Sequence, residues 1–384
     1  MSLILFWGRN FVFLRRDDIR KDEEMDGCVM KIAMLGDIAL IGKWSVETKQ
    51  WKDKLSELRK LLAEYDYVIA NLESPLTDQT KSFVAKSMHL RSKRENVKIL
   101  QYLGVSAVSL ANNHILDFGA RGLRETIETL EQVNIAWYGI NGKCLHVKHG
   151  QESVCISGFC CYSTNLITKI GSYRVNLLSP KNVLRQLEAD KLNREYSIVS
   201  LHWGIEHVHC PSMDHRKLVQ TMMQYKACSI HGHHPHVLQG IWENENGIAA
   251  YSLGNCLFDD AVSLNRKIVV RQLKENKESI LAGIEIKDQK MKDFWRIGLR
   301  EYSAGIMRDE EVEKNIDMYS QLLKHTDDPE EYERLRNRDF EKSIKQKFQK
   351  GGKLKWMVSR MSYYSIGAKL LRIKNKIRYQ SFFH

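Results

Sequence analysis

A short apolar run that leads into a cluster of histidines indicates how this chain folds: Ala227-Cys-Ser-Ile-His-Gly-His-His-Pro-His236. The apolar part is typical of a buried strand, and Pro235 favours a turn where that strand ends. Polar or metal-capable residues follow five further runs in the same way, at 31–35, 67–70, 105–110, 197–201 and 248–252. In α/β proteins the ends of strands build a ligand site at one edge of a sheet. The alternative is a set of polar loops that merely follow buried strands.

Helical spacing of apolar residues separates these runs. It occurs within 51–64, 120–132 and 214–227, where apolar side chains recur every three or four residues. Alternation of strands and helices predicts βαβ units and a layered α/β domain. We expect this domain to span 30–286, after a poorly ordered segment at 1–29. An accessory, mostly helical region with a basic tail would occupy 287–384.

The positive charge of the chain is concentrated at its end. The 384 residues carry a formal net charge of +12, and 342–384 contain twelve Lys or Arg residues and no acidic residue. The rest of the chain is therefore neutral, and no nucleic-acid partner is expected. Aromatic residues lie among these cations, which suits peripheral association with an anionic membrane. The alternative is a helical extension that packs on the body or on a partner subunit.

Three further features of the sequence bear on the cellular location of the protein: apolar stretches, cysteines and the N-terminal segment. No stretch approaches the roughly 20 apolar residues that a membrane span needs. The eight cysteines form no C-x-x-C pair, and most lie in apolar runs, which favours buried free thiols and a reducing compartment. Residues 1–7 lack a preceding positive region and do not predict a signal peptide. The expected location is the cytoplasm, with possible association with the inner face of the membrane.

Several of the polar residues have ordinary alternatives as well as chemical roles. Two histidines such as His234 and His236 point into one site only if the backbone turns between them. The alternative is a histidine-rich surface loop without a functional role. Asn113 offers an amide oxygen to a metal and His114 a proton to a leaving group. The alternative is an Asn-rich turn that caps the following helix. His202 is either a metal ligand or a buried histidine beside Trp203 whose hydrogen bonds are made within the protein. Carboxylates such as Asp37 and Glu73 supply anionic oxygens or cap helices.

Taken together, these stretches resemble the bacterial capsule-synthesis and poly-gamma-glutamate synthesis family called CapA, a branch of the calcineurin-like metallophosphoesterase fold. The matching motifs occur in family order over 31–260. They are Leu-Gly-Asp37, Ala-Asn-Leu-Glu-Ser-Pro-Leu-Thr77, His-Leu-Arg91, Ser-Leu-Ala-Asn-Asn-His-Ile-Leu-Asp-Phe-Gly119, Leu-His-Trp-Gly-Ile-Glu206, Gly-His-His-Pro-His-Val-Leu-Gln239 and Tyr-Ser-Leu-Gly-Asn255. The resemblance implies a metallophosphoesterase-like β-sandwich flanked by helices.

The resemblance also implies the roles of individual residues. His114 would be the proton donor and Asp117 would orient it, while Arg91, Glu206 and Asn255 would bind substrate. One or two divalent ions, Mn, Zn or Fe, would be held by six residues: Asp37, Glu73, Asn113, His202, His234 and His236.

Two departures from general metallophosphoesterases are visible in the sequence. Those proteins carry Asp-x-His on the first strand, whereas this chain has Asp37-Ile-Ala39, and Glu73 stands where they usually have an aspartate. The expected function is a metal-dependent hydrolase of a phosphoester or amide in capsule, exopolysaccharide or poly-gamma-glutamate biosynthesis. Its substrate would be an anionic polymer or a phosphorylated compound. The alternative is a non-enzymatic accessory protein of polymer synthesis that keeps a vestigial metal site.

Overall fold

Two β-sheets face each other in the computed structural model, which describes residues 11–13, 29–225, 227–264, 269–325, 328–348 and 363–380. The first sheet has seven strands, in the order β1 (Phe11–Phe13), β6 (Leu145–His149), β7 (Glu152–Cys160), β10 (Tyr196–His202), β11 (Cys228–His233), β13 (Gly247–Leu253) and β12 (Leu238–Asn244). The second has eight, in the order β19 (Gly305–Arg308), β18 (Lys290–Tyr302), β17 (Glu278–Lys287), β2 (Met30–Ile38), β3 (Tyr67–Leu72), β4 (Ala107–Ser109) and β5 (Ala136–Tyr138), with β14 (Asn255–Leu257) also paired to β2.

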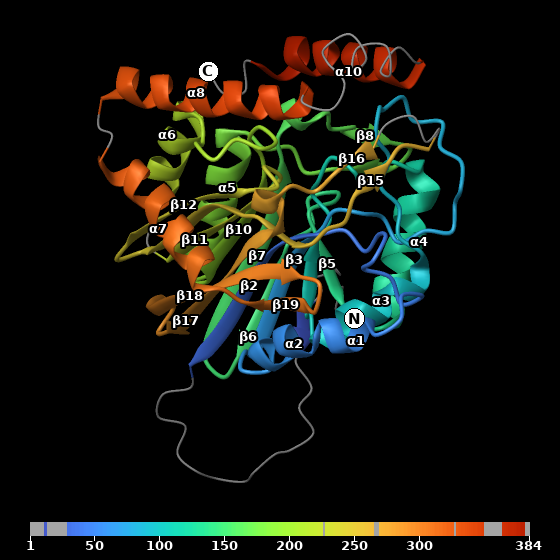
Figure 1. The fold of residues 1–384 in the computed structure, drawn as a ribbon. Coiled ribbons are helices and arrows are strands. Elements are labelled where there is room, and N and C mark those ends of the chain that lie inside the picture. Colours follow the sequence, from blue (N-terminus) through green and yellow to red (C-terminus); the bar gives the residue numbers. More distant parts are fainter. Residues whose placement is uncertain are drawn as a thin grey trace, which may run out of the picture.

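The helices and two small ribbons complete the described fold (Figure 1). The helices are α1 (Trp51–Lys54), α2 (Ser56–Leu62), α3 (Val97–Leu103), α4 (Gly119–Gln132), α5 (Pro180–Leu192), α6 (Met213–Met222), α7 (Glu310–His325), α8 (Pro329–Phe348) and α10 (Tyr363–Tyr379). The ribbons pair β8 (Lys169–Ile170) with β9 (Tyr173–Arg174) and β15 (Ala261–Val262) with β16 (Val269–Val270).

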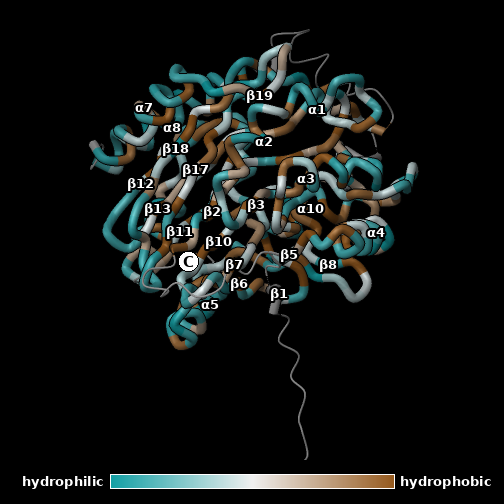
Figure 2. The backbone as a smooth tube through the Cα atoms, turned by 90° about the horizontal axis from the view of Figure 1, so that it is seen from below, coloured by the Kyte–Doolittle hydropathy of each residue, from teal (hydrophilic) through white to brown (hydrophobic). Residues whose placement is uncertain are grey.

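Apolar side chains form a core between the sheets and further cores outside them. Ile32 of β2 and Ile156 of β7 belong to the inner core. Alternate residues of the same strands face outward, where leucines of α2, α3 and α4 cover the second sheet, and Leu187 of α5 and Val219 of α6 cover the first. The hydrophobic stretches follow the central strands in Figure 2. This order of layers confirms the predicted layered α/β sandwich flanked by helices.

The second sheet continues beyond the boundary expected at Ile286. Lys287 and Lys290 end a hairpin in which β17 pairs with β18, and β18 pairs in turn with β19. The sheet therefore runs to Arg308. Polar residues alternate irregularly along β18 because much of this strand is only half-buried.

The helices and termini differ from expectation in detail. The helix expected over 214–227 ends at Met222, and the one expected over 51–64 is divided into α1 and α2. Most of the predicted poorly ordered segment 1–29 lies outside the described residues. No helix in the described ranges is both long and apolar enough to cross a bilayer.

Candidate metal centre

The ends of four strands bring two groups of potential ligands together. In the first group, Asp37 of β2, His202 of β10 and His233 of β11 offer ligand atoms within 4.8 Å of one another. In the second group, Glu73, which follows β3, joins His234 and His236 at the same limit. Five of the six metal ligands expected from the sequence are thus placed in these two groups, and the sixth, Asn113, adjoins them.

Strand register explains why distant residues meet here. β10 and β11 run parallel with His202 opposite His233, and β2 and β3 run parallel with Asp37 opposite Asn71. The carboxyl ends of parallel strands lie at the same edge of a sheet. The two sheets then meet through the backbone, because the Asp37 amide donates a hydrogen bond of 2.9 Å to the Gly254 carbonyl.

Two glycines permit this close approach. A Cβ atom at Gly36 would lie 2.0 Å from the Gly254 carbonyl oxygen, and one at Gly232 would lie 2.1 Å from the Tyr251 carbonyl oxygen. No side chain fits at such distances. Glycine is therefore required at both points: Gly36 lies against the Gly254 segment that follows β13, and Gly232 lies against the neighbouring strand β13 of its own sheet.

The histidine-rich turn depends on an unusual backbone. His234 and His236 have φ angles of 101° and 58°, in the left-handed region that non-glycine residues rarely adopt. The His234 amide donates to the Asp37 carboxylate at 3.0 Å, which helps to hold the turn. Backbone strain of this kind persists where the surroundings fix it, and it gathers at functional sites.

Glu73 lies at the centre of the two groups. Its Oε1 is 3.6 Å from Nε2 of His236, 3.9 Å from Nε2 of His202 and 4.0 Å from Nε2 of His114. The side chain is fully buried. Neither carboxylate oxygen has a hydrogen-bond partner within the described chain, and the same holds for Nε2 of His233 and Nδ1 of His234.

Charges in the centre are poorly matched without a cation. Burial raises the pKa of Glu73 well above its ordinary value, and the neighbouring Asp37 carboxylate adds to this rise. Burial also raises the pKa of Asp37. It lowers the pKa of His202 and His233 well below the ordinary value, and that of His234 to about 3. Neutral imidazoles and carboxylate oxygens are ligands for divalent transition metals. The unpartnered buried atoms and this donor set together fit a divalent ion.

Asparagines support the ligands from the side of the second sheet. The Asn71 amide donates to Asp37 at 2.7 Å. Asn113 contacts Nε2 of His202 through its amide oxygen at 3.0 Å and donates to the Thr164 carbonyl at 2.8 Å. Asn112 donates to the Asn71 side chain and to the Leu72 carbonyl. These contacts fix the orientation of Asp37 and His202.

A buried triad adjoins the centre. Nδ1 of His114 lies 2.6 Å from Asp117, whose other oxygen accepts from the Lys86 ammonium at 2.7 Å. Burial would raise the pKa of Asp117, but Lys86 and His114 bring it to about 2. Burial and the Lys86 charge lower the pKa of His114. The His114 imidazole is therefore neutral near pH 7 and presents Nε2 toward Glu73.

The three residues assigned to substrate lie at different distances from the centre. Asn255 contacts Nδ1 of His236 through its amide oxygen at 3.0 Å. The negative charge of half-buried Glu206 acts on Glu73 and His234. Arg91 is half-buried, and no contact in the described ranges joins it to the ligands. Its substrate role stays a prediction.

Sequence reasoning missed two members of the site, His233 and Lys86. β11 continues three residues beyond Ile230, where the apolar run ends, so the side chain of His233 points to the same face of the strand as that of His231. His231 is structural, because its Nε2 lies 2.6 Å from the Leu35 carbonyl of the other sheet. Lys86 comes from an irregular segment whose sequence has no period to reveal it.

Comparison with known proteins identifies a family. The sequence model described as "Bacterial capsule synthesis protein PGA_cap" matches residues 31–260. The capsule biosynthesis protein CapA of Bacillus anthracis is 32% identical over 239 residues, which cover 57% of this chain and 57% of that protein. The PGA biosynthesis protein CapA of Bacillus subtilis (strain 168) is 27% identical over 280 residues, 69% of this chain and 73% of that protein.

A similarity to solved structures is weaker. The 5'-nucleotidase precursor from Thermus thermophilus superposes with a TM-score of 0.43 and 12% identity, covering 77% of this chain and 59% of that chain. The family assignment therefore rests on the sequence match over 31–260.

Proposed function

The chain belongs to the bacterial capsule synthesis protein PGA_cap family, and from that premise we propose that it is a metal-dependent hydrolase of capsule or poly-gamma-glutamate biosynthesis. The observation that carries this proposal is Glu73, a fully buried carboxylate of the second ligand group whose two oxygens have no hydrogen-bond partner in the described chain. A buried, unpaired charge is costly unless it coordinates a cation.

The residues of the two groups would hold one or two ions. Asp37, His202 and His233 would bind one, and Glu73, His234 and His236 would bind the other. A divalent ion in such a centre polarises the bond to be broken and activates water at neutral pH. Position 39 is alanine where general metallophosphoesterases have the histidine of Asp-x-His. In this chain His233 would supply the additional nitrogen ligand beside Asp37 and His202.

His114 is the proton-transfer residue of this proposal. Its Nδ1–H is held by Asp117, so Nε2 faces the centre, 4.0 Å from Glu73. A proton taken up or released during bond cleavage would be held at this Nε2 atom. Lys86 keeps Asp117 ionised, and it also donates to the Asn113 carbonyl at 2.6 Å, which fixes the loop that carries His114.

A cleft that begins two residues after His202 in the sequence is a candidate site for an anionic substrate. It has a volume of about 310 Å³, and Gly204 and Ile205 are part of its lining. Arg336 of α8 and Lys376 of α10 also line it, together with one acidic residue, Asp214. A polymer that carries phosphates or carboxylates would be attracted to these cations.

The experiment combines metal analysis with turnover. The purified full chain should contain a divalent metal and cleave either a generic phosphoester or a gamma-glutamyl amide. Glu73→Gln should remove both properties, because the central negative charge is lost. The matched control is Glu243→Gln, on the exposed surface of β12.

A second candidate is the non-enzymatic accessory protein. The absence of Asp-x-His on the first strand favours it. Such a protein would bind an anionic polymer and give no turnover, whether or not metal is present. Bound metal without cleavage of either substrate class would therefore reject the hydrolase and support the accessory role.

We also propose that α10 attaches the protein to an anionic membrane surface. Ile366, Leu370, Ile373 and Ile377 line one side of this helix and are 60%, 62%, 55% and 80% exposed. Their spacing of three or four residues makes one apolar stripe. Exposed Lys369, Arg372, Lys374, Lys376 and Arg378 lie on the same helix. An apolar stripe flanked by cations is what an interfacial helix presents to anionic lipid.

A further inference from the structure

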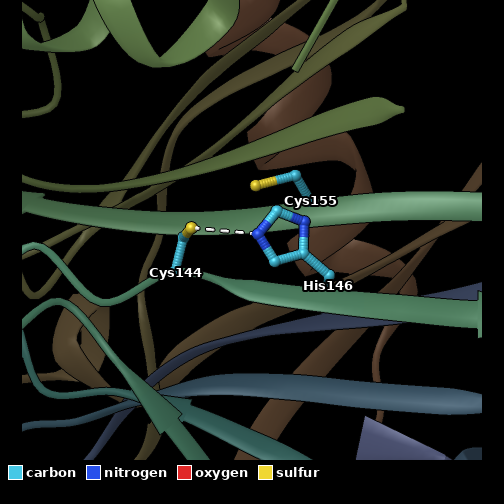
Figure 3. Close-up of side chains that lie close together, drawn as sticks. All are labelled: Cys144, His146 and Cys155. Atoms are coloured by element: carbon cyan, nitrogen blue, oxygen red, sulfur yellow. Dashed lines mark hydrogen bonds between the residues drawn. The ribbon is translucent and has the colours of Figure 1, made fainter. Parts of the chain in front are cut away.

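Two cysteines and a histidine converge at the edge of the first sheet. Cys144 comes just before β6, His146 lies within it, and Cys155 lies on β7. The two strands pair antiparallel with His146 directly opposite Cys155. Figure 3 shows both sulfurs near the same end of the His146 ring, with a dashed line from Cys144 to the ring nitrogen. One ligand atom from each residue lies within 4.8 Å of the others.

This cluster is separate from the proposed hydrolytic centre. Cys160, at the far end of β7, is the residue opposite His202. Cys155 comes five residues earlier, about 16 Å away along a strand. It also faces the other way: Val154 and Ile156 point into the core between the sheets, whereas Cys155 lies 3.5 Å from the Gln186 amide of α5.

The distances match the geometry of a bound metal. Sγ of Cys144 and Nε2 of His146 are 3.6 Å apart. Two ligands of a tetrahedral zinc ion, at about 2.3 Å for sulfur and about 2.0–2.1 Å for nitrogen, are separated by roughly 3.6 Å. The pair therefore already stands at the spacing that a shared zinc ion requires.

A carboxylate orients the histidine. Nδ1 of His146 lies 2.8 and 2.9 Å from the two oxygens of Glu195, so this nitrogen carries the donated hydrogen. In a His146 that keeps its hydrogen on Nδ1, Nε2 lies beside Sγ of Cys144 and would be the atom that binds a metal. The Ser153 hydroxyl donates to Glu195 at 3.2 Å and holds it. Metal-binding histidines are commonly oriented by a carboxylate in this way.

From this arrangement we propose that Cys144, His146 and Cys155 form a second metal site, which binds zinc. Two thiolates and an imidazole suit zinc better than a hard cation such as magnesium. Asp190 of α5 is buried, and with Cys155 and Glu195 it forms an overlapping group within 4.8 Å, so its carboxylate is in reach of a fourth position.

The role of this zinc is structural. It would fasten β6 to β7 at the edge of the sheet, and Glu195 would tie the segment after α5 to the same point. The described cysteines are all free thiols, so no disulfide among them performs this task. Metal bound only by the folded state contributes directly to folding stability.

Cobalt is the probe for the test, because thiolate ligands give Co²⁺ an intense near-ultraviolet charge-transfer absorption. The full chain is purified under reducing conditions, stripped with a chelator and titrated with Co²⁺. We expect this absorption in the parent, its loss in Cys144→Ser and Cys155→Ser, and its displacement by Zn²⁺. Cys210→Ser is the matched control and should keep it. Glu195→Gln should weaken Co²⁺ binding about 10- to 100-fold.

Three outcomes would overturn the proposal. They are the absence of thiolate absorption in the parent, its persistence in both cysteine variants, and alkylation of Cys144 that Zn²⁺ does not slow. The last would indicate a nucleophilic thiol instead. His234→Ala should leave the thiolate absorption intact, so a failure of the hydrolytic centre is distinguished from a failure of this site.

Discussion

At the scale of residues, the proposed hydrolytic centre contains side chains that would hold metal and one, His114, that would move a proton. His114→Ala should lower turnover about 10²- to 10⁴-fold, the range that a positioned acid or base contributes. Its metal content should stay near that of the parent, because His114 contacts Asp117 and belongs to neither ligand group. His234→Ala should lower metal content as well as turnover. Elemental analysis and steady-state assays on both variants check this, and loss of metal from His114→Ala would show that the roles are misassigned.

His215 on α6 predicts a pH dependence of stability. It stacks on Trp203 at 4.4 Å between ring centroids, and burial and the Arg336 charge lower its pKa from 6.5 to about 3. The His215 imidazole therefore binds a proton below about pH 6.5 in the unfolded chain, but only near pH 3 in the folded chain. Stability from this residue is complete above pH 6.5 and is lost as the pH falls through that window.

Replacement by an apolar ring removes this dependence. Between about pH 7.5 and pH 5.5 the parent should lose about 1.4 kcal/mol of unfolding free energy that His215→Phe retains. Urea unfolding at both pH values measures the difference. Equal losses in the two proteins would contradict the assignment to His215.

At the scale of elements, α10 offers a test in which only the exposed stripe changes. Its inner side packs on the body, since Asn375 is 3% exposed and donates to the Leu166 carbonyl at 2.7 Å. Leu370→Ser with Ile377→Ser should therefore leave the fold intact and reduce binding to anionic vesicles. The parent should bind anionic but not neutral vesicles, and more weakly at high salt.

Co-sedimentation with vesicles measures this binding. A chain ending at Gly351 should not bind, and Asn375→Ala serves as a control that alters the inner side. Undiminished binding by the chain ending at Gly351, or none by the parent, would reject the membrane role of the helix.

For the whole molecule, the proposed metal centre lies where the two sheets meet, so its occupancy should raise global stability. An ion at about 100 times its Kd adds about 2.7 kcal/mol to the folded state. Chelation should lower the Tm of the parent, and it should lower the Tm of His234→Ala by less. Calorimetry with and without chelator makes the comparison. Equal shifts in the two proteins would mean that the stabilising metal lies elsewhere.

The sequence predicted the sheets and most of the centre because both follow simple periods. Asp37, Glu73 and His202 come at the ends of apolar runs, where parallel strands place their chemistry. His233 escaped because the strand continues past its last apolar residue. Lys86 escaped because its position depends on tertiary contacts of an irregular segment with Asp117 and Asn113. Strand β18 was placed outside the domain, because a half-buried strand lacks a regular alternation of apolar and polar residues.

The contacts that hold α10 on the body have a consequence for regulation. Asn375 bonds to the carbonyls of Tyr162 and Leu166, and the Thr164 carbonyl between them accepts from Asn113. A surface that drew α10 outward would break the first two bonds and release the segment that holds Asn113 beside His202. If both proposals hold, linkage would make the two events reciprocal: metal occupancy would change the affinity of α10 for that surface by the same factor by which the surface changes the affinity for metal. Helix α10 would then be an allosteric element, through which attachment to a surface changes metal binding at the proposed hydrolytic centre.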